Sequence, residues 1–435
     1  MPSKLLTKLF KVLISRKLKI DYLFTQKYYM KIDQYISRLI VFAIYFIPII
    51  GLIDFFISVG ILSGTPTRGR VDHPFPAMIA GKEVLILIVF VLLAFIALHK
   101  LKIQKISAII LMSVGFLMLH TTSMIIMVAG FRESLCFVYV IAGKFLSDKS
   151  QMNQQYDGKA ALVKGLKIVL LIEFVFALLQ TQFMPSIEGF TFLGSKPVGT
   201  FTNPNAIGVF GALSILLLIL FKEEKEKIGA LYFTCSTILV LLSGSRVAIM
   251  LLLLILGINQ LTKVKSDSAK VVVFFLGIFV LAITVVNINT IAYKPSGLSV
   301  FEGARMLNFI NYLTSSDTFH LMFGHGWGVY TSWYFSLSPP SYYPPLDSFY
   351  AGILAQIGLI GSLILAVFMY WLFSQGGTKG RYLLLVFAII GLQINVFEYY
   401  PANLLIFLAL GVLISEEKSL INSTNAYPVF PGLKR

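Results

Sequence analysis

Long apolar runs, separated by short polar segments, follow one another along almost the whole chain. About 20 apolar residues in helical conformation cross the roughly 30 Å hydrocarbon core of a bilayer. The pattern therefore predicts an all-α polytopic membrane protein of about 12 transmembrane helices. The apolar runs lie at 39–63, 84–98, 106–128, 133–146, 166–183, 204–221, 229–243, 247–261, 271–291, 348–373, 382–397 and 402–414, the fourth being short.

The lengths of the intervening segments divide the chain into five parts. A long loop before the tenth helix is the main interruption, and its glycines, prolines and aromatic residues favour a folded, substrate-facing element over a structureless loop. The expected parts are a basic amphipathic cytoplasmic segment (1–38), membrane helices one to nine (39–291), the large outer-face loop (292–347), helices ten to twelve (348–414) and a cytoplasmic tail (415–435).

The composition agrees with a membrane protein and excludes several other classes. Hydrophobic residues make up 57% of the chain and charged residues 13%, against roughly 25% charged in soluble proteins. Cys136 and Cys235 lie inside apolar runs, where packing is the expected role. No Walker loop, dinucleotide fingerprint or zinc-ligand spacing is present, so no cofactor is expected. The basic N-terminus leads into a full-length run, which is untypical of a cleavable signal peptide.

Basic residues predict the orientation. The N-terminal segment and the loops at 99–105, 144–167, 222–227, 262–270 and 378–381 carry most of the Lys and Arg, and alternating spans place them on one side. By the positive-inside rule that side is cytoplasmic, as are both termini. Because the net charge of +16 is sorted by side, it does not indicate nucleic acid. The N-terminal segment is expected on the inner leaflet, or alternatively as a solvated basic tail.

Several basic residues nevertheless fall on the outer face. Arg132 and Arg246 are each expected in the first turn of a helix, with Ser245 capping the second one. A cation at the positive end of the helix dipole is unfavourable by roughly 0.3–1 kcal/mol, which suggests an anion there. Snorkelling to lipid phosphates is the alternative. The outer-face set is Arg68, Arg70, Lys82, Arg132, Lys196, Arg246, Lys294 and Arg305.

The sequence TFTNPNA opens one of the outward-starting helices. Asn203 is a good N-cap and Pro204 suits the first helical position, where its missing N–H is no loss. Capping does not explain Asn205, whose amide is free to point into the outer compartment. Glu173, Asp54 and His120 are titratable residues inside apolar runs, and pairing within the bundle is their expected state.

Three motifs in order resemble the O-antigen polymerase and O-antigen ligase superfamily. In the first motif, residues 196–205, a basic residue precedes G-x-F-x-N-P-N. The second is a small-residue turn that ends in Ser-Arg at Arg246. The third consists of Arg305, the GHGWG sequence of 324–328, Asp347-Ser348 and the GLIG sequence of 358–361. The resemblance covers about residues 165–375. It departs at Lys196, where the family commonly has Arg, and at Asp347, where the ligase branch typically has His. The second departure favours a polymerase.

The resemblance implies a fold like that of C-type glycosyltransferases. It implies transfer of a glycan from undecaprenyl pyrophosphate to another lipid-linked repeat unit, on the outer face of a bacterial cytoplasmic membrane. In this interpretation Arg246, Arg305 and Lys196 stabilise the departing pyrophosphate, and Asp347 is the base that activates the acceptor hydroxyl, or alternatively an N-cap. The catalytic candidates are Asp347, Arg246 and Arg305, and the substrate-binding candidates are Lys196, Asn203, Asn205, Arg132, His325, Trp327 and Glu398.

The histidines and aromatic residues of the loop have two interpretations. His320 and His325 are structural or, for His325 above all, part of the site; Trp327 and the neighbouring aromatic side chains stack on sugars or form an interfacial belt. Expected partners are the lipid-linked oligosaccharide, membrane lipids, a chain-length regulator and a flippase. The alternatives are a ligase with a lipid A core, protein or wall acceptor, a lipid-linked oligosaccharide flippase or transporter, and a non-catalytic export partner.

Overall fold

The computed structural model describes residues 124–152, 158–183, 197, 199–201, 204–222, 229–261, 309–331, 346, 348–392, 394–397, 399 and 401–426, and part of 38–49. These residues form helices and connecting turns, without a strand, so the all-α prediction is confirmed for them. The helices are α4 (Met124–Met152), α5 (Gly158–Phe183), α6 (Pro204–Phe221), α7 (Ala230–Ser243), α8 (Arg246–Leu261), α11 (Thr318–Phe323), α13 (Phe349–Ser374), α14 (Gly377–Gly391) and α15 (Ala402–Ala426).

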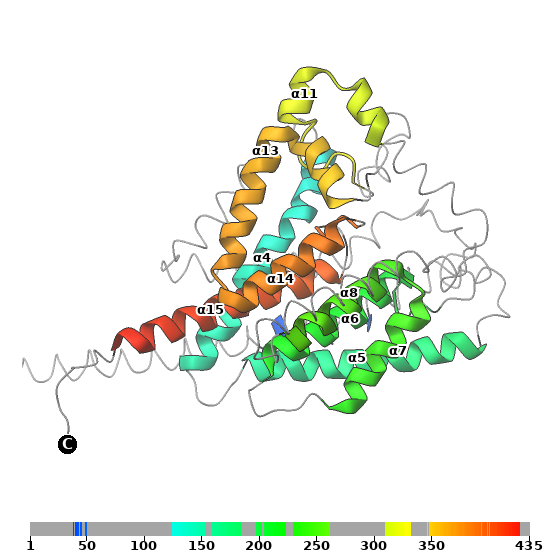
Figure 1. Ribbon diagram of the computed structural model, residues 1–435, viewed down its shortest axis with the longest axis vertical. Coiled ribbons are helices and arrows are strands. Elements are labelled where there is room, and N and C mark those ends of the chain that lie inside the picture. The colour runs from blue at the N-terminus through cyan, green and yellow to red at the C-terminus, as the bar shows by residue number, and fades with distance from the viewer. Residues whose placement is uncertain are drawn as a thin grey trace, which may run out of the picture.

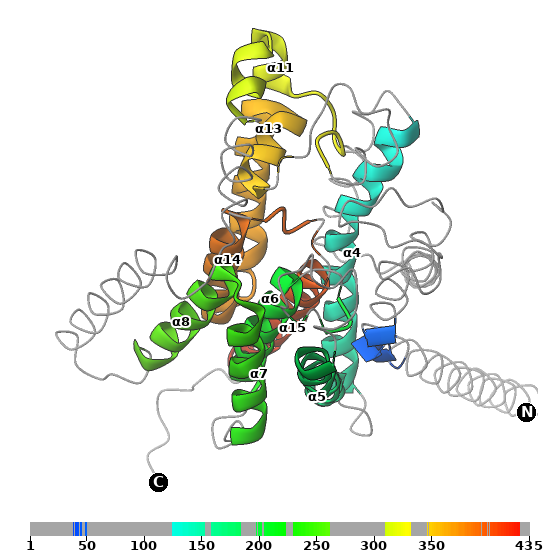
Figure 2. The same ribbon diagram turned by 90° about the vertical axis from the view of Figure 1, so that its right-hand side faces the viewer.

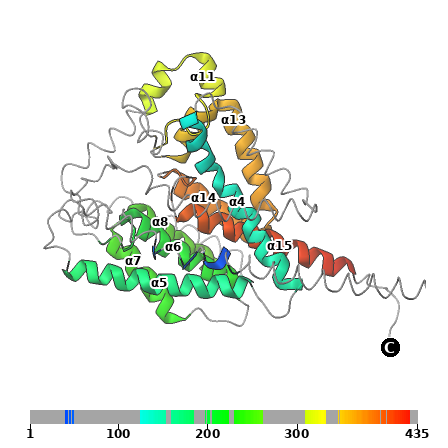
Figure 3. The same cartoon turned by 180° about the vertical axis from the view of Figure 1, so that it is seen from behind.

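The helices α4 and α15 cross in close contact (Figures 1 and 3). Two glycines permit this approach. A Cβ atom on Gly143 would lie 1.9 Å from the carbonyl oxygen of Leu408, and one on Gly411 would lie 2.0 Å from that of Val140. Because backbone atoms cannot move aside, only glycine fits at either position. The crossing of α4 and α15 is therefore fixed by two residues that have no side chain.

The contacts define two ends of the helical bundle. At one end Lys159, at the start of α5, forms an ion pair with Glu416 of α15 (Nζ–Oε1 2.8 Å), and Glu417 lies against Gly377 at the start of α14. At the other end the last turns of α5 contact the turn at 199–200. Figure 2 shows α4 extending from the level of α7 up toward α11, beside α13. The first end is called the 416 end below, and the second the 199 end.

Several predicted boundaries agree with the structure. The span 204–221 coincides with α6, and α7 and α8 begin within one residue of the predicted runs. Ser245 caps α8 as expected, since its Oγ accepts the N–H of Ala248 at 3.4 Å. The runs 84–98 and 271–291 and the segment 1–37 lie outside the described residues.

Other boundaries were wrong. Residues 129–132, predicted to be an outer loop, lie inside the continuous helix α4, because this stretch contains no proline and a single glycine costs only about 1 kcal/mol in a helix. The run 382–397 ends early: α14 stops at Gly391, and 394–397 form a turn in which Asn395 bonds to the backbone of Phe397. The helix α15 continues through the predicted tail to Ala426.

The helix α13 is long and apolar enough to cross a membrane, judged by length and composition; α6, α7 and α8 contain shorter apolar stretches. Two further features describe α13. Gly358 interrupts it with φ +65° and ψ −175°, so the helix consists of a short segment (349–357) and a longer one (359–374). The longer segment exposes apolar side chains: Leu363 is 60% exposed, Ile364 64% and Val367 70%.

Candidate functional site

The loop that carries the GHGWG sequence wraps around the interruption in α13. Gly324, Gly326 and Gly328 have φ values of +80°, +116° and +95°, which side chains rarely adopt. The loop and the helix approach so closely that a Cβ on Gly324 would lie 2.2 Å from the carbonyl oxygen of Gln356. A Cβ on Gly358 would lie 2.3 Å from the backbone of Met322 in α11. The glycines of the GHGWG motif, and Gly358 of the GLIG motif, are thus explained by backbone geometry.

The same loop caps the end of the first α13 segment. A helix leaves its last carbonyl groups without helical partners. Here the carbonyl of Ala355 accepts the N–H of His325 at 3.0 Å, and that of Gln356 accepts the N–H of Gly326 at 2.8 Å. The carbonyl of Leu354 accepts the Tyr312 hydroxyl at 3.2 Å. The interruption is therefore closed by the loop of residues 324–331.

A buried carboxylate connects this junction to α4. Glu133 is fully buried, and its Oε1 accepts Nδ2 of Asn395 at 2.8 Å and Nε2 of Gln356 at 3.3 Å. The Oε1 atom of Gln356 in turn accepts the N–H of Gly328 at 2.9 Å. Residues far apart in sequence, from α4, α13, the loop and the turn after α14, thus meet in one polar cluster, called the Glu133 cluster below.

Trp327 forms a second attachment to α4. Its side chain is fully buried, and Nε1 donates to the carbonyl oxygen of Gly130 at 2.8 Å and to Oγ of Ser134 at 3.1 Å. A Cβ on Gly130 would lie 2.5 Å from the indole ring. Trp327 is therefore a packing residue, and the prediction that it binds substrate was wrong.

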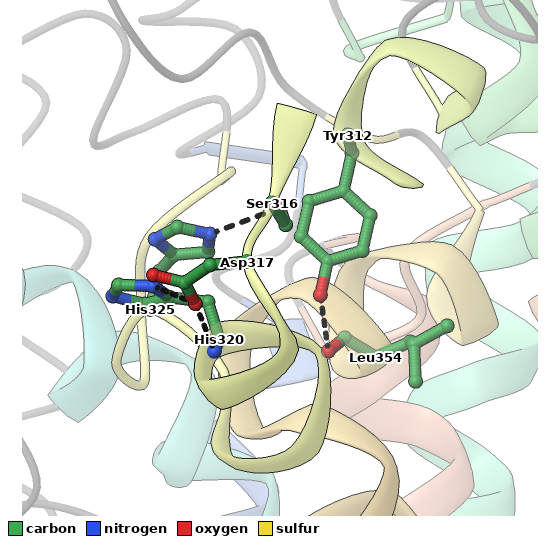
Figure 4. A network of polar contacts seen from close by, with 6 residues as sticks. All are labelled: Tyr312, Ser316, Asp317, His320, His325 and Leu354. Atoms are coloured by element: carbon green, nitrogen blue, oxygen red, sulfur yellow. Dashed lines mark hydrogen bonds and ion pairs between the residues drawn. The ribbon is translucent and has the colours of Figure 1, made fainter. Parts of the chain in front are cut away.

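The imidazole rings of His320 in α11 and His325 in the loop stack on each other (Figure 4). The rings of His320 and His325 are nearly parallel (10°), with centroids 4.2 Å apart. Asp317 caps α11 and also contacts Nδ1 of His320, each at 2.8 Å. Nε2 of His325 lies 3.4 Å from the Ser316 hydroxyl. Burial and the neighbouring His320 lower the pKa of His325, against the opposing effect of Asp317.

The stack is enclosed by aromatic rings. Tyr312 and Tyr330 both pack edge-on against His325, with centroids 5.9 and 5.6 Å away. Tyr330 has a positive φ of +65°, and its carbonyl accepts the N–H of Leu346, so the loop is joined to the segment just before α13. His325 is accordingly held in place by both tyrosines, and both histidines are partly buried.

The Gly-Thr-Phe turn before α6 is held by two polar side chains of α5. The N–H of Gly199 donates to Oε1 of Gln180 at 2.7 Å, and its carbonyl accepts from Nε2 of Gln180 at 2.5 Å. Glu173 accepts both the N–H and the hydroxyl of Thr200. Gly199 has φ +62°, and a Cβ there would lie 2.4 Å from the Glu173 carboxylate. Glu173 is paired inside the bundle, as expected.

The turn that carries Arg246 packs against the start of α6. A Cβ on Gly208, in the second turn of α6, would lie 2.3 Å from Oγ of Ser243 and 2.8 Å from the side chain of Ala248. Gly244 ends α7 in the left-handed conformation, which explains it as a C-cap. Arg246 begins α8 and is partly exposed, and Asn205 in the first turn of α6 is exposed. These two predicted site residues therefore belong to adjoining elements.

Arg132 is not at a helix start. It is partly buried and follows more than two turns of α4, so the predicted placement in a first turn was wrong and the dipole argument does not apply to it. It directly precedes Glu133 along the helix.

Five of the catalytic and substrate-binding candidates lie outside the described residues: Lys196, Asn203, Arg305, Asp347 and Glu398. The structure describes the neighbours of Asp347. Leu346 is buried and bonded to Tyr330, and the N-cap position of α13 belongs to Ser348, whose hydroxyl bonds to the carbonyl of Gly391 at 3.2 Å. The N-cap position considered for Asp347 is thus occupied by the next residue, whose side chain makes no capping hydrogen bond.

Sequence reasoning missed Glu133, Gln356 and Asn395. The available signal was a carboxylate within an apolar run, FRESLCFVYV, since ionisable residues inside membrane segments are functional candidates by default. Among the residues that the structure describes, no group of three His, Cys, Asp or Glu is arranged to hold a metal ion.

Comparison with known proteins gives no further assignment. No protein-family model matches the chain, and no curated protein matches it significantly. The functional assignment therefore depends on the motifs and on the geometry described above.

Proposed function

We propose that this chain is a membrane-embedded glycosyltransferase that polymerises lipid-linked oligosaccharides, closer to O-antigen polymerases than to the ligase branch. The observation that carries the proposal is the contact between two motifs. The turn ending in Arg246 packs against the first turns of α6, so a cation at a helix start lies beside the segment that contains Asn205. Such a pair suits the recognition of a lipid pyrophosphate.

The exposed surface of α13 supports a membrane location. Length and composition alone also fit a buried helix of a soluble protein, but α13 exposes Leu363, Ile364 and Val367 along one face. In water, a contiguous apolar surface of this kind is unfavourable. We propose that this face contacts lipid, with the 199 end outside and the basic 416 end in the cytoplasm.

In the proposed reaction, the acceptor hydroxyl attacks the anomeric carbon of the donor sugar as the bond to pyrophosphate breaks, which inverts that carbon. The hydroxyl proton passes to a carboxylate, for which Asp347 is the candidate. Arg246, with Lys196 and Arg305, stabilises the negative charge that develops on the pyrophosphate. The substrates are two lipid-linked oligosaccharides, and the lipid pyrophosphate leaving group supplies the driving energy.

The interruption in α13 favours a second candidate, a lipid-linked oligosaccharide transporter, because broken helices are typical of transporter binding sites. In such sites the unwound carbonyls coordinate ions. Here the carbonyls of Leu354, Ala355 and Gln356 accept donors from the protein itself, which argues against that use.

The product made in a deletion strain tests the proposal. Loss of a polymerase leaves single repeat units exported and attached, loss of a flippase leaves none outside, and loss of a ligase leaves long chains on the carrier lipid. We expect the first pattern. Wild-type protein should restore long chains, whereas Arg246→Ala and Asp347→Asn should not, although both reach the membrane.

The matched control is Arg381→Ala, which removes an exposed arginine near the opposite end, in the second turn of α14. It should restore long chains fully. Normal chains with Arg246→Ala, or equal loss with both arginine variants, would refute the assignment of Arg246.

A further inference from the structure

Glu133 occupies an unusual position for a carboxylate. It is fully buried on α4, the longest described helix, where a leucine would pack with no loss of solvation. Burying this group is unfavourable unless donors surround it. Two amide groups donate to a single oxygen, those of Asn395 and Gln356.

Each of these amides also holds a backbone N–H. The Gln356 amide accepts the N–H of Gly328 through its oxygen at 2.9 Å. The Asn395 amide accepts the N–H of Phe397 through its oxygen at 3.3 Å. In both cases the nitrogen of the amide points to Glu133. The two amides are therefore oriented alike, with nitrogen toward the carboxylate and oxygen toward a turn.

An amide side chain can be rotated by half a turn with little change in shape, which exchanges its donor and its acceptor. Bonds at both ends determine the orientation. A carboxylate accepts and does not donate, so Glu133 excludes the reversed orientation for Gln356 and Asn395. The reversed amide would place its N–H₂ group against the backbone N–H of Gly328 or Phe397, two donors facing each other.

We propose that Glu133 is a positioning residue: its carboxylate orients Gln356 and Asn395 so that they hold two separate segments, the loop 324–331 and the turn 394–397, against α4. The first segment carries His325 and leads toward the region of Asp347. The second immediately precedes Glu398. Arg132 is the neighbour of Glu133 on α4. One buried oxygen thus sets the geometry of three elements that carry candidate site residues.

The role of this positioning in glycan transfer depends on the proposed function, but the positioning itself does not. Hydrogen exchange of the backbone amides measures it directly, on the full-length protein in lipid nanodiscs. The amides to follow are those of Gly328 and Phe397. Glu133→Leu should accelerate exchange at both by about tenfold or more, because each loses the partner that orients its acceptor.

Two variants separate positioning from general loosening of α4. Glu133→Gln keeps an oxygen that accepts the same two amides, so both rates should stay within about threefold of the wild type. Leu146→Ala shortens another fully buried side chain toward the far end of the same helix and leaves the Glu133 cluster and the Trp327 bonds intact. This control should leave the exchange rates of both amides unchanged. Equal acceleration by Leu146→Ala, or no acceleration by Glu133→Leu, would overturn the proposal.

Of these variants, Glu133→Leu carries the greatest risk of a folding defect. A variant that disturbs only one of the two amide contacts therefore provides an independent test. Gln356→Leu removes the partner of Gly328 and leaves Asn395 bonded to Glu133. It should accelerate exchange at Gly328 alone. Equal acceleration of exchange at Phe397, or no acceleration at either amide, would overturn the proposal even if Glu133→Leu did not accumulate.

Activity is read separately in the deletion strain. Glu133→Gln should restore long chains, and Glu133→Leu should give short chains or none. If the wild-type protein itself makes no polymer, the proposed function fails while the exchange experiment still decides the positioning. If both Glu133 variants restore normal chains, the link between positioning and transfer fails although the polymerase assignment stands.

Discussion

The interruption in α13 allows a prediction whose size follows from the structure. Gly358→Ala places a side chain at φ +65° and ψ −175°, a region used almost only by glycine, which costs about 1–3 kcal/mol. The new Cβ would also lie 2.3 Å from the backbone of Met322 and 2.4 Å from the N atom of Phe323. Neither atom can move without shifting α11, which adds about 1–3 kcal/mol.

The two contributions together amount to about 2–6 kcal/mol. A chain of this length unfolds with an entropy near 0.9 kcal/mol per degree, so the midpoint should fall by roughly 2–6 °C. The assay is thermal unfolding of purified protein in detergent. Gly257→Ala is the matched control, because a Cβ there meets nothing within 4 Å on a regular helix, and it should leave the midpoint unchanged or raise it. Equal midpoints for both variants would refute the reasoning.

Three further predictions concern packing, hydrogen bonding and pH. Gly411→Ala should lower the unfolding midpoint by about 1–3 °C or more, since its Cβ would lie 2.0 Å from the carbonyl of Val140. Thr200→Val should destabilise the turn before α6 by about 1.5–3 kcal/mol, because Glu173 loses one of its two donors. Below about pH 6.5, stability should fall with pH, since the pKa of His325 is lowered in the folded protein and the unfolded chain takes up the proton first.

Each of these predictions has its own control. Gly411→Ala is compared with Gly257→Ala, and a loss no larger than in that control contradicts the packing argument. For Thr200, the substitution Thr200→Ser keeps the hydroxyl and should retain most of the stability; equal losses in both variants would show that the hydroxyl is unimportant. For the pH effect, His325→Phe should flatten the slope between pH 7.5 and 5.5, and a wild-type protein that gains stability toward pH 5.5 contradicts the sign.

Local pattern was sufficient for much of the helical architecture. The apolar run 204–221 gave α6, because Pro204 starts a helix well and the run that follows has no interruption. Ser245 was identifiable as a cap by its position alone. The same reasoning failed at 129–132, which separated two predicted apolar runs but lies inside α4, where Gly130 is required by the contact with the Trp327 ring.

The motif positions were recognisable in sequence, but their physical roles were not. In the sequence, the glycines of GHGWG and GLIG were parts of the family resemblance without a physical role. In the structure, Gly324 and Gly358 permit loop and helix to touch backbone to backbone. Trp327 was expected at a substrate surface and is instead fully buried against α4. A sequence motif marks that a residue type is needed, and burial determines whether substrate can reach it.

By itself the sequence determined the periodic features of this protein: its helical class, the starts of α6, α7, α8, α13 and α15 to within one residue, and the sorting of basic residues by loop. These depend on neighbours within a few turns. Only the tertiary structure decided that Glu133, Gln356 and Asn395 form one cluster, because their bonds join residues 223 and 262 positions apart. Helical periodicity specifies which face of a helix is apolar, but it does not specify which distant side chains meet across the bundle.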